Sequence, residues 1–496
     1  MSRLTKNISA NFLSNVWSTF LLLLLTPLYI DFLGIESYGL IGFYISWIAL
    51  LGILDNGISA TASREIAWLS ARTNERKNIP NLIRTLEVTY WGIVLIIGVI
   101  ILIGIKLYGS SWFQSDNLDS VLIQDALILM AISLVLQVPS GLYIGGLMGM
   151  QRQVECSMFV ALFGTVRGVG AILVLWLVSP DIKTYFLWNI VASGIQTGIM
   201  RSVLWRKINL TKCVASFSIE ALHSVKMFAG GMMLITALAL IMGHADKIIL
   251  SRLISLEMFG YYMLAWTVAS ALSRISTPLI QAIGPYFTEL ASMKNEEVIS
   301  KQLRLASQFM NALILPPTAL IIFFAEPIIN VWVGNQAVAE GVSPILMVLI
   351  VGTMFTSCSY PLLSVLYSYK KIRMLVMLNV TLVVILLPLL VIVVKNIGTI
   401  GAAYIWVLYG LAHYFVTLNL GLRLLMKHKL IALMMKDFMT LFFVSFSITG
   451  GAWLFLENLD EKLITVLLLG CVLVICWFIT MLSSQVLRKN ILERLS

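Results

Sequence analysis

The sequence predicts an all-α, polytopic membrane protein with two pseudo-symmetric sets of six transmembrane helices and two further helices at the C-terminal end. Composition, long apolar segments and the distribution of basic residues all indicate this class. Apolar residues make up 59% and charged residues 12% of the 496 residues, whereas soluble domains have about 45–50% and about 25%. The mean hydropathy is +0.94. Lipid must therefore be the solvent for much of the chain, which excludes a soluble enzyme, a disordered protein and a fibrous protein.

Fourteen apolar segments are long enough to cross a bilayer, which takes about 20 helical residues. The first segment is too long for the apolar part of a secretory signal and lacks a small-residue cleavage site, so we expect it to be a spanning helix. The predicted spans are 9–33, 39–63, 85–108, 123–147, 158–178, 184–204, 227–250, 258–284, 305–333, 343–368, 374–394, 400–422, 438–456 and 463–483.

The basic residues predict the orientation of these spans. With the N-terminus in the cytoplasm, 26 of the 34 Lys and Arg residues lie on inner segments and 6 on outer loops or span ends. Because Lys and Arg collect on cytoplasmic loops, we expect both termini in the cytoplasm. The same rule accounts for the net charge of +10, so we expect no nucleic-acid partner. The amphipathic inner segments 64–84, 206–226 and 287–304 predict interfacial helices. The alternative is twelve spans, with the last two apolar segments at the interface.

A short repeat divides the chain. Residues 33–39 (LGIESYG) and 254–260 (ISLEMFG) share one pattern: aliphatic, small, aliphatic, Glu, any residue, aromatic, Gly. Each follows the first span of a six-span set, and repeats joined in one bundle are typical of transporters, with the site at the interface of the repeats. The expected parts are a first lobe at 1–204, a cytoplasmic linker at 205–226, a second lobe at 227–425 and a C-terminal part at 426–496.

No motif indicates a cofactor, a metal or a nucleotide. The sequence lacks HExxH, CxxC and GxxxxGK[ST], and its five cysteines have no metal-ligand spacing. Small residues at four-residue spacing predict helix-packing faces. The cysteines, expected to be reduced, are Cys156, Cys213, Cys358, Cys471 and Cys476, and the glycines of the packing faces are Gly141, Gly145, Gly149, Gly164 and Gly168.

Arg274 is the sharpest candidate for a binding residue. A charge at the bilayer centre costs roughly 2.5–3.5 kcal/mol, and Arg274 lies in the middle of the eighth span, where Thr277 and Gln281 continue its polar face. We predict that Arg274 contacts an anionic group of a substrate, because a guanidinium stays charged and forms paired hydrogen bonds with phosphate oxygens. The alternative is a structural ion pair with a carboxylate such as Asp55.

Asp55 and Arg64 lie on a polar face in the inner half of the second span. Asp55 binds a coupling cation, H⁺ or Na⁺, or holds an arginine, and the sequence leaves both open. Arg64 is a basic anchor at the membrane boundary or touches the substrate.

Further polar residues lie within other spans. Asn11 and Asn15 share one face of the first span, as in a cavity wall or a set of interhelical hydrogen bonds. Arg167, in the fifth span, is either a second cation facing the lumen or part of a buried pair. Asp246 precedes Lys247 near the outer end of the seventh span, where it braces the helix end or takes part in ion coupling.

Several short motifs resemble polysaccharide flippases of the multidrug/oligosaccharidyl-lipid/polysaccharide exporter superfamily, and most of all O-antigen flippases of bacterial inner membranes. The resemblance extends over nearly the whole chain through topology. Its motifs are Lys6-Asn7 to Asn15, Thr26-Pro27-Leu28-Tyr29, residues 33–39, Asp55-Asn56-Gly57-Ile58 with Arg64-Glu65, and Asp246-Lys247-Ile248-Ile249-Leu250 leading to Gly260-Tyr261-Tyr262.

The resemblance implies two lobes around a central cavity. It implies alternating access that turns an undecaprenyl-diphosphate-linked oligosaccharide from the cytoplasmic to the periplasmic leaflet of the inner membrane. Arg274 and Arg64 lie on the same helices as the cations that would receive the diphosphate in the related lipid II flippases, although no aligned motif links them. The implied partners are this glycan and membrane lipids, together with a polysaccharide polymerase and a chain-length regulator.

Three other functions compete with this interpretation. A drug/cation antiporter of the same superfamily would need a cavity dominated by carboxylates, whereas two arginines lie in mid-span here. A membrane-embedded glycosyltransferase, polymerase or ligase would need a sizeable outer domain, whereas the longest expected outer loop, at 109–123, is short. A scaffold would not need Arg274 at mid-depth. A lipid II-type flippase remains an alternative within the proposed class.

Overall fold

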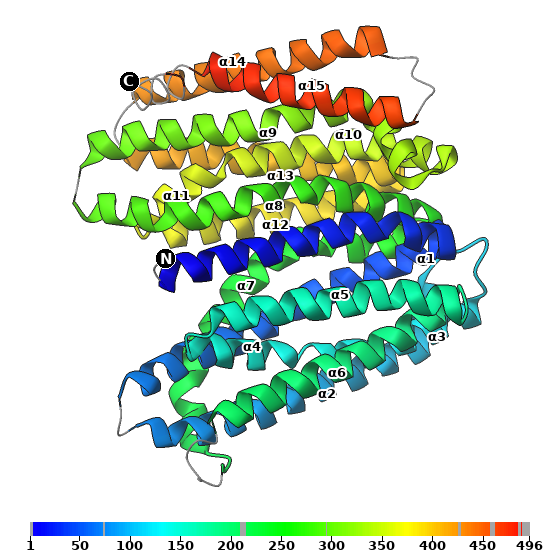
Figure 1. Ribbon diagram of the computed structural model, residues 1–496, viewed down its shortest axis with the longest axis vertical. Helices are drawn as coiled ribbons and strands as arrows, with labels where there is room; N and C mark the ends of the chain where they lie inside the picture. The colour runs from blue at the N-terminus through cyan, green and yellow to red at the C-terminus, as the bar shows by residue number, and fades with distance from the viewer. Residues whose placement is uncertain are drawn as a thin grey trace. The chain divides into compact units, whose positions relative to one another are not determined.

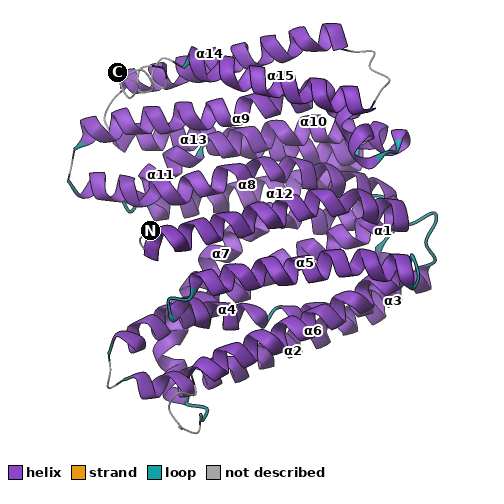
Figure 2. Cartoon of the chain, viewed as in Figure 1, coloured by secondary structure: helices purple, strands orange, loops and turns teal. Residues whose placement is uncertain are grey.

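Helices make up nearly all of the chain in the computed structural model, which describes residues 3–72, 75–208, 215–293, 295–424, 428–456, 462–484 and 488. Figure 2 shows helices joined by short loops, and no strand occurs among these residues. The elements are α1 (Arg3–Ala71), η1 (Arg76–Asn78), α2 (Ile79–Trp112), α3 (Ser120–Gln137), α4 (Ser140–Gly149), α5 (Gln153–Leu177), α6 (Ile182–Ile208), α7 (Ile219–Leu253), α8 (Leu256–Ser292), α9 (Glu296–Val333), α10 (Gln336–Cys358), α11 (Tyr360–Ser368), α12 (Ile372–Ile397), α13 (Thr399–Leu424), α14 (His428–Leu456) and α15 (Lys462–Ser483).

All fourteen predicted spans coincide with these helices. Helix α1 contains the first two, α3 with α4 forms the fourth, and α10 with α11 forms the tenth. In the described part of the chain, ten helical stretches are long and apolar enough to cross a membrane. Helices α6, α7 and α8 are not among them, although they have 27, 35 and 37 residues and are long enough by length alone. The all-α membrane fold is confirmed.

The chain forms two compact units, residues 1–260 (unit 1) and 261–496 (unit 2). Their boundary differs from the predicted lobes because α7 packs along α1 and α2 within unit 1. Gly57 permits this approach, since a Cβ there would lie 2.3 Å from Met233 Cγ. Within the expected linker at 205–226, α6 continues to Ile208 and α7 begins at Ile219, so both ends of this segment are helical.

In the part of the chain that the structure describes, the inner segments 64–84 and 287–304 do not form the separate interfacial helices that we expected. In the described residues, segment 64–84 is divided between α1, the short η1 and α2, and segment 287–304 continues α8 and α9. The reason is length: the 37 residues of α8 extend for about 55 Å at 1.5 Å per residue, more than the roughly 30 Å of a hydrocarbon core. Segment 209–214 lies outside the described residues, and so does Cys213.

The two copies of the repeat meet inside unit 1. Gly34 has φ +76° and bends α1 between its two spans. A Cβ on Gly39 would lie 3.0 Å from the Leu256 carbonyl oxygen, and a Cβ on Gly260 would lie 2.3 Å from the Ile35 carbonyl oxygen. Residues 35 and 39 correspond to 256 and 260 in the repeat. The contact is therefore reciprocal, as contacts about a two-fold axis are.

A second repeated feature is the corner after α4 and after α11. Gln151 and Lys370 are the non-glycine residues with positive φ in the described chain, at 61° and 57°. Arg152 N donates to Leu147 O at 3.1 Å, and Lys371 N donates to Leu366 O at 3.0 Å. All these positions correspond at an offset of 219 residues, so the internal repeat extends well beyond the seven-residue motif.

The C-terminal helices α14 and α15 pack on α9 in unit 2, as the orange and red ribbons of Figure 1 show. Arg304 on α9 forms a bidentate ion pair with Asp437 on α14, with Nε–Oδ2 at 2.6 Å and Nη2–Oδ1 at 2.9 Å. The Trp477 indole of α15 donates to Leu313 O at 3.1 Å. The added spans are thus held by polar contacts as well as by apolar packing.

Candidate functional site

Two helices are interrupted at corresponding places in the repeat. Helix α3 ends at Gln137 and α4 begins at Ser140, while α10 ends at Cys358 and α11 begins at Tyr360. Pro139 lies in the first break, where proline removes a backbone donor and disfavours a continuous helix. Interrupted helices at matching positions are the best structural pointer to the binding region of a transporter built from repeats.

Asp55 lies against α4, just after the first break. Gly141, Gly145 and Gly149 form a stripe along α4, and the inner half of α1 packs directly on it. A Cβ at these glycines would lie 1.6 Å from Asp55 Oδ1, 2.4 Å from Ser59 O and 2.6 Å from Ser63 O. The predicted packing role of these three glycines is thereby confirmed. Gly141 in particular leaves the space that the Asp55 carboxyl occupies.

The Asp55 carboxyl has no ion pair within the described part of unit 1, and its Oδ1 is buried without a hydrogen-bond partner. Beside it lies the Tyr90 hydroxyl, which donates to the Val138 carbonyl oxygen at the helix break at 3.3 Å. A buried acceptor without a partner is costly, so it marks a place for a proton, a cation or a water molecule.

Arg167 is held in unit 1 without a carboxylate. Its Nη2 donates to Gln196 Oε1 at 2.6 Å, and its Nε is buried without a partner. The side chains of Tyr29, Tyr44 and Tyr185 lie near enough to interact with its charge. Of the two alternatives from the sequence, the buried ion pair is absent within the described part of this unit. A guanidinium among neutral hydroxyls and an amide can receive an anionic or hydroxyl-rich ligand.

Sequence reasoning missed the most connected polar cluster of unit 1. Glu87 on α2 is 2% exposed and accepts from Arg201 Nε at 2.6 Å, from Tyr143 Oη at 2.9 Å and from Arg84 Nη1 at 3.0 Å. Trp91 donates to the Tyr143 hydroxyl at 3.2 Å. The available signal was a lone carboxylate, Glu87, inside the predicted span 85–108. The cluster joins α2, α4 and α6 beside the first helix break.

In unit 2, Arg274 lies next to the second break. Its neighbour Ser273 hydrogen-bonds the Tyr360 hydroxyl at the start of α11, and Ser359 lies 3.1 Å from His413 Nδ1. Arg274 is exposed, and no carboxylate pairs with it in the described part of unit 2. Asp55 belongs to the other unit. Thr277 and Gln281 also lie in α8, but their side chains are outside the described residues.

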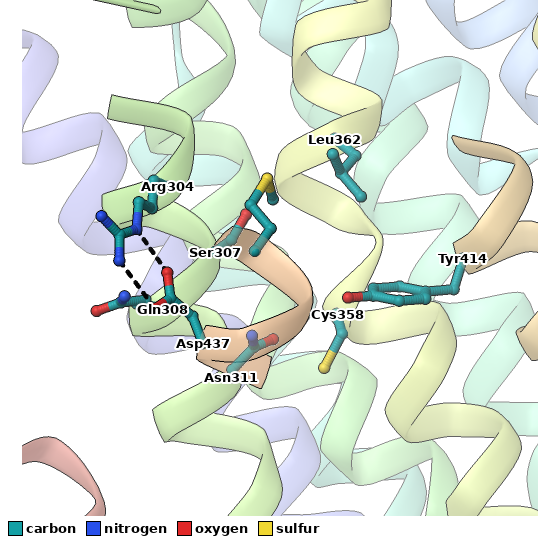
Figure 3. Close-up of a pocket in the computed structure, with 9 residues that line it drawn as sticks. Arg304, Ser307, Gln308, Asn311, Cys358, Leu362, Tyr414 and Asp437 are labelled. Carbon is teal, nitrogen blue, oxygen red and sulfur yellow. Dashed lines mark hydrogen bonds and ion pairs between the residues drawn. The ribbon is translucent and has the colours of Figure 1, made fainter. Parts of the chain in front are cut away.

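Residues of α9, α10, α11, α13 and α14 in unit 2 enclose a small polar cavity (Figure 3). Its volume is about 10 Å³, enough for about one water molecule and far too small for a glycan. Ser307 Oγ and Asn311 Oδ1 line it, and both are buried without a partner. Arg304 and Asp437 close one side through their ion pair. The cavity can therefore hold one bridging water.

The remaining predicted residues have local partners. Arg64 Nη2 lies 3.3 Å from Glu65 Oε1, and the arginine side chain is 56% exposed. Asn15 Nδ2 donates to Asn11 Oδ1 at 3.4 Å, and both side chains are exposed. Asp246 is joined through both oxygens to the fully buried Lys247 at 2.9 Å. This geometry agrees with the bracing interpretation of Asp246 and leaves its role in ion coupling a prediction.

The arrangement can bind and orient a charged ligand. Each unit contains an interrupted helix and a guanidinium without a carboxylate partner in the described part of that unit. Unit 1 adds a carboxyl with a free acceptor atom. Charged groups of this kind inside a membrane are costly and mark substrate or ion pathways.

Comparison with known proteins agrees with this arrangement. The chain matches the family described as polysaccharide biosynthesis protein over residues 4–291. A Shigella flexneri protein, named provisionally as an O-antigen transporter, is 22% identical over 382 residues, which cover 75% of this chain and 87% of that protein.

Two solved structures have a similar fold at low sequence identity. One is the lipid II flippase MurJ in an inward closed conformation, with TM-score 0.72, 14% identity and coverage of 94% of this chain and 96% of that one. The other is an inward-facing multidrug resistance MATE family transporter of the MOP superfamily, with TM-score 0.69, 14% identity and coverage of 84% and 96%. The family match spans more than half of the sequence, so the chain belongs to the polysaccharide biosynthesis protein family and has the fold of membrane transporters.

Proposed function

We propose that this protein is a flippase that moves an undecaprenyl-diphosphate-linked oligosaccharide, an O-antigen or similar repeat unit, from the cytoplasmic to the periplasmic leaflet of a bacterial inner membrane by alternating access. The likeness to the O-antigen transporter and to the lipid II flippase supports a lipid-linked glycan as substrate. A polysaccharide polymerase and a chain-length regulator are the partners that such a step requires downstream.

The proposal is carried by one observation: each unit contains an arginine that pairs with no carboxylate in the described part of that unit. Arg167 keeps a buried Nε free, and Arg274 adjoins the second helix break. A diphosphate carries charge that only fixed cations can offset away from water, and arginine binds phosphate oxygens through paired hydrogen bonds. No covalent bond changes in this reaction.

Asp55 is the proposed coupling group. Its buried Oδ1 lacks a partner and lies against Gly141 at the first helix break, where a proton or Na⁺ would satisfy it. Occupation of this position would change the packing of α1 on α4, so the ion would favour one arrangement of the broken helix over the other. Asp246 stays a weaker candidate, because Lys247 already satisfies it.

The first experiment is deletion of the gene in its host, followed by extraction of undecaprenyl-linked lipids. We expect complete repeat units to accumulate on the inner leaflet, scored by mass and by an impermeant glycan probe, with loss of surface polymer. Complete units on the outer leaflet would instead indicate a polymerase or ligase. Unchanged lipid-linked glycans would contradict the proposal.

Complementation of the deletion tests the site. Arg274→Ala and Arg274→Glu are expected to abolish surface glycan while protein level and membrane insertion persist, and Arg167→Ala is expected to reduce it. The matched control is Arg373→Ala, which removes an exposed arginine from the same unit as Arg274. Normal export by both Arg274 variants would remove this residue from the site.

A drug/cation antiporter is the second candidate, and Asp55 favours it. A buried carboxyl without an ion pair in its unit can bind an organic cation as well as a proton, and the MATE likeness supports the same chemistry. The antiporter predicts that cells without the gene become sensitive to cationic drugs while their lipid-linked glycans stay unchanged.

The proposed orientation places both termini in the cytoplasm of a cell with an inner membrane. Labelling of single cysteines by an impermeant maleimide tests it. A cysteine at position 77 should react only after the membrane is opened, and one at position 117 should react in intact spheroplasts. The reverse pattern would invert the topology.

A further inference from the structure

A cavity of about 590 Å³ opens at one end of unit 1, away from the helix breaks. It lies between the end of α1, η1, the corner that joins α4 to α5, and the end of α6. Its size is that of a small-ligand pocket. The charge bias of the sequence places this end of the unit at the cytoplasmic surface of the membrane.

Three cations line this cavity: Arg76, Arg152 and Lys207. One carboxylate partly offsets them, since Glu155 pairs with Arg152 and lies 2.6 Å from Lys207 Nζ. Arg76 donates only to a backbone carbonyl, that of Ser70, at 2.8 Å in the described structure. The cluster therefore keeps a surplus of about two positive charges around an open space.

Local structure restricts the positions of two of these cations. Arg152 follows the left-handed residue Gln151, and its own N–H donates to Leu147 O at 3.1 Å. Lys207 lies in the last turn of α6, where its side chain is only a quarter exposed. Fixed cations lose less entropy on binding an anion than mobile surface lysines do.

The surroundings of the cavity are those of a membrane interface. Trp68 on α1 is 47% exposed and carries the Arg72 guanidinium over its ring at 3.8 Å, and tryptophan is enriched at the headgroup level of bilayers. Met148 and Met158 are also exposed beside this corner, at 39% and 67%. Apolar surface next to a basic pocket suits a ligand with an anionic head and acyl chains.

We propose that this cavity, with Arg76, Arg152 and Lys207 at its wall, is a binding site for a phosphate group, supplied by the headgroup of an anionic phospholipid such as phosphatidylglycerol or by free phosphate. Basic pockets between transmembrane helices on the cytoplasmic side are suited to phospholipid headgroups. The site is separate from the proposed substrate site and does not depend on it.

The test uses the purified full-length protein and a fluorescent short-chain phosphatidylglycerol, with phosphatidylcholine as the neutral lipid. The triple variant Arg76→Gln/Arg152→Gln/Lys207→Gln removes the cations of the cavity. The matched control, Arg72→Gln/Lys77→Gln/Arg206→Gln, removes equal charge from exposed positions at the same end that do not line the cavity. At about fivefold per cation, we expect the first triple to weaken phosphatidylglycerol binding at least tenfold and the control far less.

Arg76→Gln alone keeps the assay decisive if the triple variant fails to fold, because it leaves no carboxylate unpaired in the described structure. It should weaken phosphatidylglycerol binding about fivefold. Competition with inorganic phosphate distinguishes a phospholipid headgroup from free phosphate as the ligand. A concentration of about 10 mM is used, because it is well above a weak Kd of about 1 mM. Displacement supports a site that phosphate alone can fill, and no displacement supports a lipid site. Equal loss in both triples, or unchanged binding in the cavity variants, would overturn the proposal.

Discussion

Replacement of Gly145 by alanine tests the close packing of α1 on α4. A Cβ at this position would lie 2.4 Å from the Ser59 carbonyl oxygen and 2.8 Å from Ser59 Cα, whereas ordinary contacts are 3.4–4 Å. The obstructing atoms belong to the backbone, so the two helices must separate by roughly 1 Å. Overpacking of this kind costs about 1–3 kcal/mol. We expect Gly145→Ala to lower the apparent melting temperature and to impair transport, because Asp55 and the helix break belong to the same contact.

Gly198→Ala is the matched control on α6. Nothing lies within 4 Å of a Cβ at Gly198, and alanine is a better helix former than glycine by about 0.8–1 kcal/mol. This variant should be as stable as the parent or slightly more so. Both variants are compared in the same detergent by tryptophan fluorescence during heating. Equal melting temperatures for Gly145→Ala and Gly198→Ala would refute the packing argument.

Asp55→Asn keeps the shape of the carboxyl but not its charge, so transport should continue without dependence on an H⁺ or Na⁺ gradient in vesicles; retained dependence would exclude this residue as the coupling group. Arg304→Ala should destabilise the protein by about 2–3 kcal/mol, because it leaves the largely buried Asp437 without its ion pair. Unfolding in denaturant measures this loss, and the exchange Arg304→Asp/Asp437→Arg should recover part of it. The hydrogen bond from Lys207 holds the pKa of Glu155 below its ordinary value of 4.5, so this carboxylate stabilises the corner above that pH and loses its effect only as the pH falls further. Phosphatidylglycerol binding should therefore be constant from pH 8 to about 5.5. The variant Glu155→Gln removes a negative charge beside the cavity and should strengthen phosphatidylglycerol binding.

Much of the fold was predictable because lipid imposes strong constraints on sequence. A spanning helix must satisfy its own backbone and present about 20 apolar residues, so all fourteen predicted spans coincide with helices. The glycine stripe on α4 was predictable for the same reason, since close helix contact in a membrane needs small residues. Charges at mid-depth are costly enough that Asp55, Arg167 and Arg274 attract attention in the sequence alone.

The sequence alone determined the class of protein, the spans and several of the charged residues within them, because each of these follows from the local cost of placing a side chain in lipid. Only the tertiary structure decided which groups meet: α7 packs within unit 1, the Asp55 carboxyl lies over Gly141, and Glu87 gathers Arg201 and Tyr143 from distant helices. These contacts join residues far apart in the chain. They depend on helix rotation and register, which hydropathy does not encode because every face of a spanning helix can be apolar.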